Sequence, residues 1–290
     1  MASNDDSTLC RALIDYQQYP IDDPKHPEYR RAIDECRKAL ADDGCAVLNG
    51  FISPYGLERL LTEVEERRPL AYFSKSKKTN VYFSSDDPSL PPDHPRRIFL
   101  DRTNGFVTSD HFDDDTAARQ LYYWPPLTQF MADCLGKKIL YIYDDPVSNM
   151  IVNVGKPGTR FNWHFDTNEF TITMLLKPAA SGGHFEYIPN LRSAEDENYE
   201  AVSRVLNGDD TRIVRLDLNP GDLQLFLGRF SLHRVTENTG DTDRLLLIMS
   251  FAEKPGMIGS QHRIQELYGK VTDAHIAAER KRVRNDGLMD

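Results

Sequence analysis

The chain has 290 residues, and its 45 acidic and 35 basic side chains give a formal net charge of −10. This acidic balance argues against a nucleic acid or an anionic membrane as a partner. No apolar run approaches the roughly 20 residues of a membrane span. The polar, acidic start of the chain has no feature of a signal or transit peptide. We therefore expect a cytoplasmic protein of one large domain or two small ones.

The first part of the chain predicts helical support. Residues 1–26 are polar and interrupted by prolines, so we expect a loosely ordered segment there. Pro27 suits the first turn of a helix, and Ser53 is a candidate N-cap. Residues 70–115 are rich in Ser, Pro, Asp and Lys, which is typical of a lid over a site or of disorder. The expected helices cover residues 27–41, 53–68 and 116–136, the last broken at Pro125–Pro126.

Strands dominate from residue 137 onward. Short apolar runs alternate with turn signals, as in a sandwich or barrel. We predict a mostly β protein with flanking helices, built on a double-stranded β-helix (jelly roll). The expected division is one domain over 27–290, with helical support and a possible lid at 27–136, the jelly-roll core at 137–256 and a helical segment at 257–290.

The segment 160–166 carries the first chemical signal, because His164 and Asp166 lie two residues apart. In a strand, such residues point to the same face. A histidine from another strand would complete a set of two histidines and one carboxylate, which holds non-heme Fe(II) and leaves the opposite positions open.

A second segment supplies that histidine. His233 follows the apolar run 223–227, and Arg244 opens the next strand after a turn at 238–241. A hairpin would bring Arg244 back near His233, where its guanidinium could bind a carboxylate through two hydrogen bonds.

This pattern resembles the Fe(II)/2-oxoglutarate-dependent oxygenases. Over residues 120–270, the segments 182–192, 228–236 and 255–257 are also similar to the branch of free-lysine halogenases and related amino-acid hydroxylases. The resemblance implies that His164, Asp166 and His233 bind Fe(II), and that Arg244 binds the distal carboxylate of 2-oxoglutarate. O2 is the second cosubstrate, and ascorbate the expected reductant in vitro.

The same resemblance indicates which reaction to expect. The halogenases of this branch have glycine where this chain has Asp166, and that glycine opens an iron position for chloride. The carboxylate at this position implies oxygen transfer instead.

Strand parity adds further candidates. Ser250 shares the face of Arg244, Asn162 shares the face of His164, and Thr173 lies on the next strand. Each is a candidate for cosubstrate binding, or an ordinary strand residue with hydrogen bonds inside the barrel.

Three residues are candidates for substrate binding: Arg102, Asp145 and Asn168. Arg102 lies where an arginine of the lysine-acting relatives holds the substrate carboxylate; the alternative is a solvated surface arginine. Those relatives carry an acid just after the iron carboxylate, whereas this chain has Thr167 and Asn168. Lysine is therefore in doubt as the substrate, although Asp145 or Glu169 could compensate.

We expect a hydroxylase of an unactivated C–H bond in a free amino acid or similar small metabolite, releasing succinate and CO2. Desaturation or cyclisation by the same cofactors is the alternative within enzymes. A small-molecule sensor without turnover is the alternative of another class. We expect a monomer or homodimer.

Overall fold

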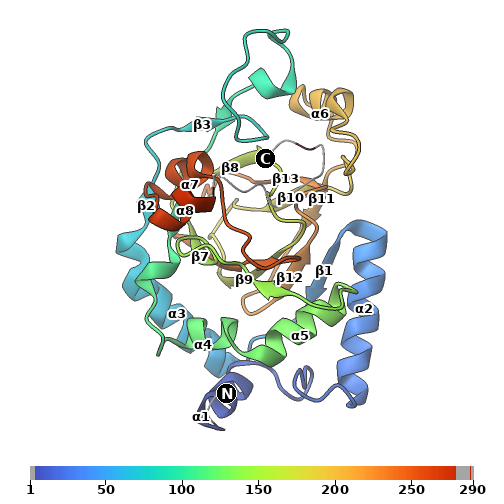
Figure 1. The fold of residues 1–290 in the computed structure, drawn as a ribbon, viewed down its shortest axis with the longest axis vertical. Coiled ribbons are helices and arrows are strands. Elements are labelled where there is room, and N and C mark those ends of the chain that lie inside the picture. Colours follow the sequence, from blue (N-terminus) through green and yellow to red (C-terminus); the bar gives the residue numbers. More distant parts are fainter. Residues whose placement is uncertain (1–3, 279–287, 289–290) are drawn as a thin grey trace.

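The computed structural model describes residues 4–278 and residue 288, and its centre is formed by two antiparallel sheets (Figure 1). The larger sheet has seven strands, in the order β1-β12-β9-β14-β7-β5-β2. These strands are β1 (Cys45–Leu48), β12 (Leu223–Phe226), β9 (Thr171–Lys177), β14 (Arg244–Met249), β7 (Met150–Gly155), β5 (Gly105–Val107) and β2 (Tyr72–Phe73).

The smaller sheet has four strands in the order β11-β10-β13-β8, and it carries both expected histidine ligands. It comprises β11 (Val214–Leu216), β10 (Phe185–Ile188), β13 (Leu232–Val235) and β8 (Phe161–His164). Two short ribbons complete the strands: β6 (Tyr141–Ile142) with β15 (Phe251–Ala252), and β3 (Lys78–Thr79) with β4 (Leu100–Asp101). The predicted jelly roll with flanking helices is confirmed.

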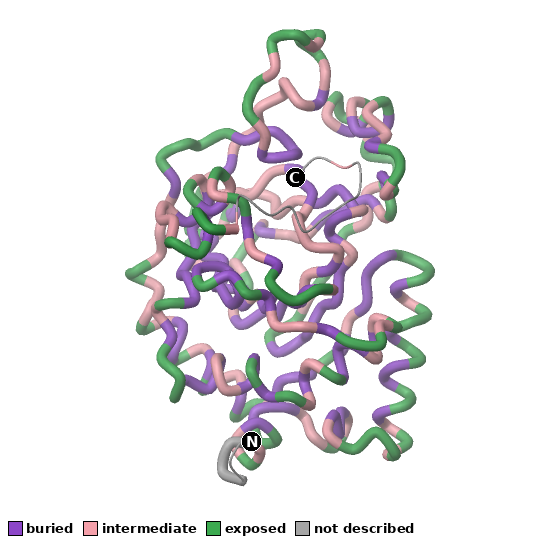
Figure 2. The backbone as a smooth tube through the Cα atoms, viewed as in Figure 1, coloured by how far each residue is buried: buried purple, intermediate pink, exposed green. Residues whose placement is uncertain are grey.

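Alternation along the central strands divides the large sheet into an apolar outer face and an inner face that lines a cavity. In β14, Leu245 and Leu247 belong to the main apolar core, whereas Leu246 and Ile248 line the cavity. Figure 2 shows buried backbone running through these central strands.

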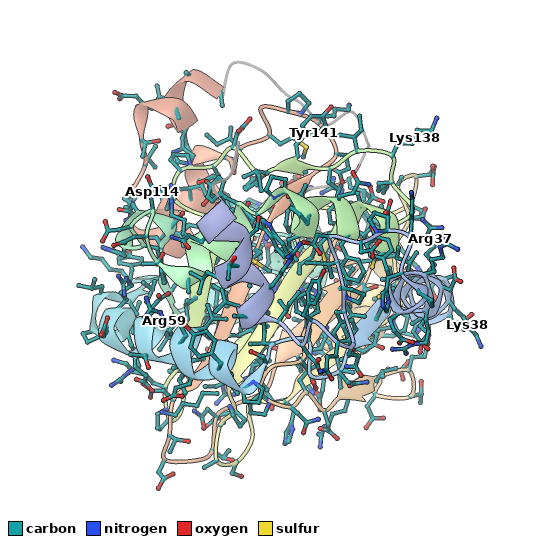
Figure 3. The ribbon with its side chains drawn as sticks, turned by 90° about the horizontal axis from the view of Figure 1, so that it is seen from below. Arg37, Lys38, Arg59, Asp114, Lys138 and Tyr141 are labelled. Carbon is teal, nitrogen blue, oxygen red and sulfur yellow. The ribbon has the colours of Figure 1, made fainter. Side chains whose placement is uncertain are left out.

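Five helices cover the outer face of the large sheet: α1 (Asn4–Leu13), α2 (Pro27–Asp43), α3 (Pro54–Arg67), α4 (Ala117–Tyr122) and α5 (Pro125–Cys134). The N-cap of α3 is Ser53, whose hydroxyl accepts a hydrogen bond from the Gly56 N–H. Gly44 ends α2 in the left-handed conformation. Seen from this side, charged side chains such as Arg37, Lys38 and Arg59 lie at the outside of the helical layer (Figure 3).

The structure contradicts the loose order expected for residues 1–26 and the disorder considered for residues 70–115, whereas the lid stays a prediction. The segment expected to be loosely ordered contains α1, and Leu13, Tyr19 and Ile21 are buried in the main core. The stretch 70–115 is also packed: it forms four short strands and the 3-10 turns η2 (Pro95–Arg97) and η3 (Ser109–His111). Another 3-10 turn, η1 (Arg68–Leu70), precedes it. Apolar side chains of both segments are buried, although the composition of these segments is largely polar.

The remaining helices are α6 (Tyr199–Leu206), α7 (Gln261–Tyr268) and α8 (Asp273–Ala278). The charged residues 279–284 expected to continue α8 lie outside the described residues. All four cysteines are buried, and none of them is in a disulfide. No helix in the described part of the chain has the length and apolarity of a membrane span.

Candidate active site

The strands place His164 and His233 side by side. They are directly opposite each other in the register of β8 and β13, and their ring centroids are 4.1 Å apart. The Oδ1 atom of Asp166 lies 3.5 Å from His233 Nε2 and 3.9 Å from His164 Nε2. One ligand atom from each of the three residues falls within 4.8 Å of the others. The set is therefore capable of binding a metal ion.

Backbone carbonyls orient both imidazoles. His164 Nδ1 lies 2.8 Å from the carbonyl oxygen of Asn162, and His233 Nδ1 lies 3.0 Å from that of Ser231. A carbonyl accepts hydrogen bonds, so each Nδ1 carries the proton and each Nε2 keeps its lone pair for a metal.

The charge states also suit a cation. Burial lowers the pKa of His164 well below its ordinary value, and the neighbouring His233 adds to this effect. Burial alone would raise the pKa of Asp166, but His233, His164 and the Thr171 hydroxyl outweigh it, and the pKa falls below its ordinary value. A neutral imidazole and an ionised carboxylate are the forms that bind metals.

Asp166 is fixed from two sides. Its Oδ2 accepts a 2.7 Å hydrogen bond from the Thr171 hydroxyl, and its backbone N–H donates to the carbonyl of Gly228 at 3.0 Å. Gly228 has no room for a side chain, since a Cβ there would lie 2.1 Å from Asp166 Oδ2. The backbone of the turn after β12 therefore lies directly against the carboxylate of Asp166.

A cavity of about 140 Å³ opens in front of the three residues. Of the expected binding residues, Thr173, Ser250 and Asn168 line it. Thr173 donates a 3.0 Å hydrogen bond to Gln224, which also lines the cavity. Helix α7 forms another wall through Arg263, Ile264, Leu267 and Tyr268.

Arg244 is buried at the end of this cavity, in a smaller pocket of about 10 Å³. The two spaces share Asn153, Phe161 and Val235 as walls. The Nη1 atom of Arg244 has no hydrogen-bond partner, and burial alone lowers the pKa of this side chain to about 10. A buried guanidinium without a counter-charge fits the carboxylate of a bound acid.

The chemistry of His164, Asp166 and His233 also fits an iron ion. Two imidazoles and one carboxylate suit non-heme Fe(II) and leave positions for a chelating 2-oxo acid. Together with the unpaired Arg244, these residues fit Fe(II) and 2-oxoglutarate.

Two expected site residues lie elsewhere. Asn162 does not line the cavity, and its amide oxygen accepts from the Trp163 N–H. Asp145 is fully buried outside the cavity, where it pairs with His275 at 3.0 Å and accepts from three backbone N–H groups. Asp145 is therefore used within the fold and has no lone pair directed at a substrate. His275 is buried as well.

Arg102 is not a solvated surface residue. It is fully buried, and its Nε and Nη1 atoms have no hydrogen-bond partner. The backbone of Arg102 forms an isolated β-bridge with that of Phe161. The ring of Phe161 lines the cavity and stacks on His164, with ring centroids 3.7 Å apart. Arg102 itself does not line the cavity, and its Nη2 lies 3.4 Å from the carbonyl of Glu266 in α7.

Sequence reasoning missed the contribution of α7. Arg263 lines the cavity, donates to the carbonyl of Phe165 at 3.3 Å, and lies over the ring of Phe83. This helix is short and polar, so no pattern in the sequence pointed to the cavity. Strict alternation would place Phe161 with Trp163, on the face opposite His164, but the register between β8 and β13 shifts at this point and Phe161 stacks on His164.

The family model of halogenase D matches residues 100–265. No curated protein matches the sequence. Among solved structures, the 2-oxoglutarate-dependent epimerase SnoN from nogalamycin biosynthesis is similar with a TM-score of 0.54 and 14% identity, over 84% of this chain and 93% of that chain.

Two other structures have the same fold. A Trichoplax adhaerens prolyl hydroxylase, in complex with a hypoxia inducible factor peptide, has a TM-score of 0.52 and 16% identity, over 76% of this chain and 89% of that chain. An oxidoreductase of the 2OG-Fe(II) oxygenase family from Burkholderia pseudomallei has a TM-score of 0.52 and 13% identity, over 77% and 91%. At these identities the structures establish the fold alone.

The halogenase D model covers more than half of the chain, from β4 into α7. Both histidines, Asp166 and Arg244 fall within the matched range. The chain belongs to the halogenase D family of Fe(II)/2-oxoglutarate-dependent oxygenases.

Proposed function

We propose that this enzyme hydroxylates an unactivated C–H bond in a small, carboxylate-bearing metabolite such as a free amino acid. The observation that carries the proposal is the carboxylate of Asp166 beside the two histidines. In this proposal His164, Asp166 and His233 hold the iron, so no metal position on that side is left for a halide.

The other roles follow from burial and charge. Arg244 holds the distal carboxylate of 2-oxoglutarate in the small pocket. When bound, the iron and 2-oxoglutarate supply the oxidising chemistry. The protein orients the substrate and limits the access of water, with α7 and the ring of Phe161 as walls.

Two guanidinium groups support an anionic substrate. Arg263 lines the cavity, and Arg102 lies just behind it with two unpaired nitrogens. Arg263 is only half-buried, and a substrate carboxylate near α7 would offset the cost of burying the charge of Arg102. Asn168 supplies an amide, whose oxygen has no partner, for an amine or another polar group of the substrate.

The test is Asp166→Gly, assayed with Fe(II), 2-oxoglutarate, ascorbate and chloride against a panel of amino acids and related metabolites. In the wild-type enzyme, we expect substrate-stimulated succinate release and a product heavier by one oxygen atom. The variant should lose at least 100-fold in hydroxylation, because a ligand of the metal is gone. Undiminished hydroxylation in the variant would contradict the ligand assignment.

The masses of the products and the release of succinate in this assay also distinguish the alternative functions. A product lighter by two hydrogens would indicate desaturation or cyclisation. Binding of a metabolite without any succinate release, across the whole panel, would favour a sensor.

A further inference from the structure

Asn104 is the second unpaired polar side chain in the small pocket that contains Arg244. Its exposed fraction is 3%, and neither its Oδ1 nor its Nδ2 atom has a hydrogen-bond partner. Buried amides are almost always hydrogen-bonded. An unpaired one that lines a pocket therefore indicates a ligand.

The register of three neighbouring strands explains why Asn104 and Arg244 share this pocket. Arg244 in β14 is opposite Gly155 in β7, and Gly105 in β5 is opposite Val154. Continuing that register by one residue places Asn104 next to Gly155 on its other side. Residues directly opposite one another point to the same face of a sheet. Because Gly155 has no side chain, a gap separates the amide from the guanidinium.

Apart from Asn153, which also lines the larger cavity, the other polar side chains that line the pocket have partners. The amide of Asn238 donates to the carbonyls of Gly155 and Thr242, and the Thr159 hydroxyl donates to the carbonyl of Lys156. The Thr236 hydroxyl accepts from the His184 N–H. In the described part of this pocket, Asn104 and Arg244 are the side chains with unpaired buried atoms.

We propose that the Asn104 amide is a second donor to the distal carboxylate of 2-oxoglutarate, opposite the guanidinium of Arg244. The inference rests on the proposed role of Arg244. The pocket volume of about 10 Å³ is near the smallest that holds one water, so at most the outer oxygen of a carboxylate enters it. Asn104 thus helps to select a 2-oxo acid that carries a carboxylate at this distance from the metal.

The experiment compares two ligands of equal chain length in the Mn(II)-loaded enzyme. Both 2-oxoglutarate and 2-oxovalerate have the metal-chelating head, but 2-oxovalerate lacks the distal carboxylate. Isothermal titration gives the affinity of each ligand for wild type, Asn104→Ala and the isosteric Asn104→Asp. Mn(II) affinity reports whether each variant has kept its metal site.

We expect Asn104→Ala to bind 2-oxoglutarate on the order of 10- to 100-fold more weakly, as for the loss of a hydrogen bond to a charged group. Its affinity for 2-oxovalerate should stay within about two-fold of wild type. Asn104→Asp should lose more, because a second carboxylate repels the ligand.

Three outcomes would count against the inference, and they can be told apart. Unchanged 2-oxoglutarate affinity in both variants would show that Asn104 is not a donor. Equal losses for both ligands would show a structural role. If wild type binds both ligands equally well, the proposed role of Arg244 itself is wrong.

Discussion

Gly228 shows how a single missing side chain can control a metal site. Its carbonyl holds the backbone of Asp166, and its Cα faces the carboxylate, where a Cβ would lie 2.8 Å from Asp166 Cγ. Real Cβ atoms essentially never approach so closely, so a substitution must move the turn or the carboxylate.

We predict that Gly228→Ala weakens Mn(II) binding by about tenfold or more, because metal sites tolerate little displacement of a ligand. Equilibrium titration with Mn(II) measures the effect. The matched control is Gly136→Ala, at a helix end with open space around the added Cβ. The control should cost some stability through its left-handed backbone, and leave Mn(II) affinity unchanged. Equal affinities in all three proteins would refute the prediction.

At this scale, the sequence predicted the residues whose chemistry has a fixed spacing. The spacing of His164 and Asp166, with His233 after a turn, predicted three side chains that line one cavity, and Arg244 lies in the smaller pocket that adjoins it. Asn104 directly precedes β5. Its role depends on which strand lies beside β7, and sequence spacing does not contain that information.

Helix α7 is the element on which the cavity depends most and which the sequence predicted least. Its eight residues carry few apolar side chains; Ile264, Leu267 and Tyr268 pack in a small apolar cluster, and further contacts outside the helix also hold it in place. Asp145 provides these contacts: it accepts from Gly259 N–H just before α7 and pairs with His275 in α8. The buried pair therefore fastens the C-terminal helices to the sheets.

We predict that Asp145→Ala destabilises the protein by about 3–5 kcal/mol, since it leaves His275 and several N–H groups buried without a partner. Urea unfolding measures the loss, and hydrogen exchange should rise first in α7 and α8. The neighbouring Asp144→Ala is the control, because Asp144 is exposed and its carboxylate accepts from the Gly256 N–H. Unchanged exchange in α7 and α8 would contradict the proposed fastening.

Longer elements were easier to predict. The apolar stripe of α2, the Ser53 cap of α3 and the proline break between α4 and α5 all lie where local patterns indicated. These helices bury a full face against one sheet, so their periodicity is strong. The short strands between residues 70 and 115 bury isolated side chains, so the sequence there has no hydrophobic periodicity from which strands could be predicted.

Over the whole molecule, stability and function lie on opposite faces of the large sheet. The outer face and helices α1–α5 form the main apolar core. The inner face carries the cavity and the buried charge of Arg244. Burying a charge without a partner costs several kcal/mol. The ligand-free protein therefore carries a cost at its inner face that the outer core must offset, and a bound anion should relieve that cost.

We predict an unusual result for Arg244→Met. Without ligands, the variant should melt at the same temperature as wild type or higher, because an apolar side chain replaces an unpaired buried charge. With Mn(II) and 2-oxoglutarate at about 100 times its Kd, wild type should gain about 2.7 kcal/mol from the acid, or on the order of 5 °C. The variant should show the Mn(II) effect and no further gain from the acid, because its guanidinium is absent. Calorimetry of both proteins with and without each ligand provides the comparison. A variant that melts far below wild type without ligands would mean that Arg244 is a structural residue, and a variant that keeps the full gain would place the carboxylate elsewhere.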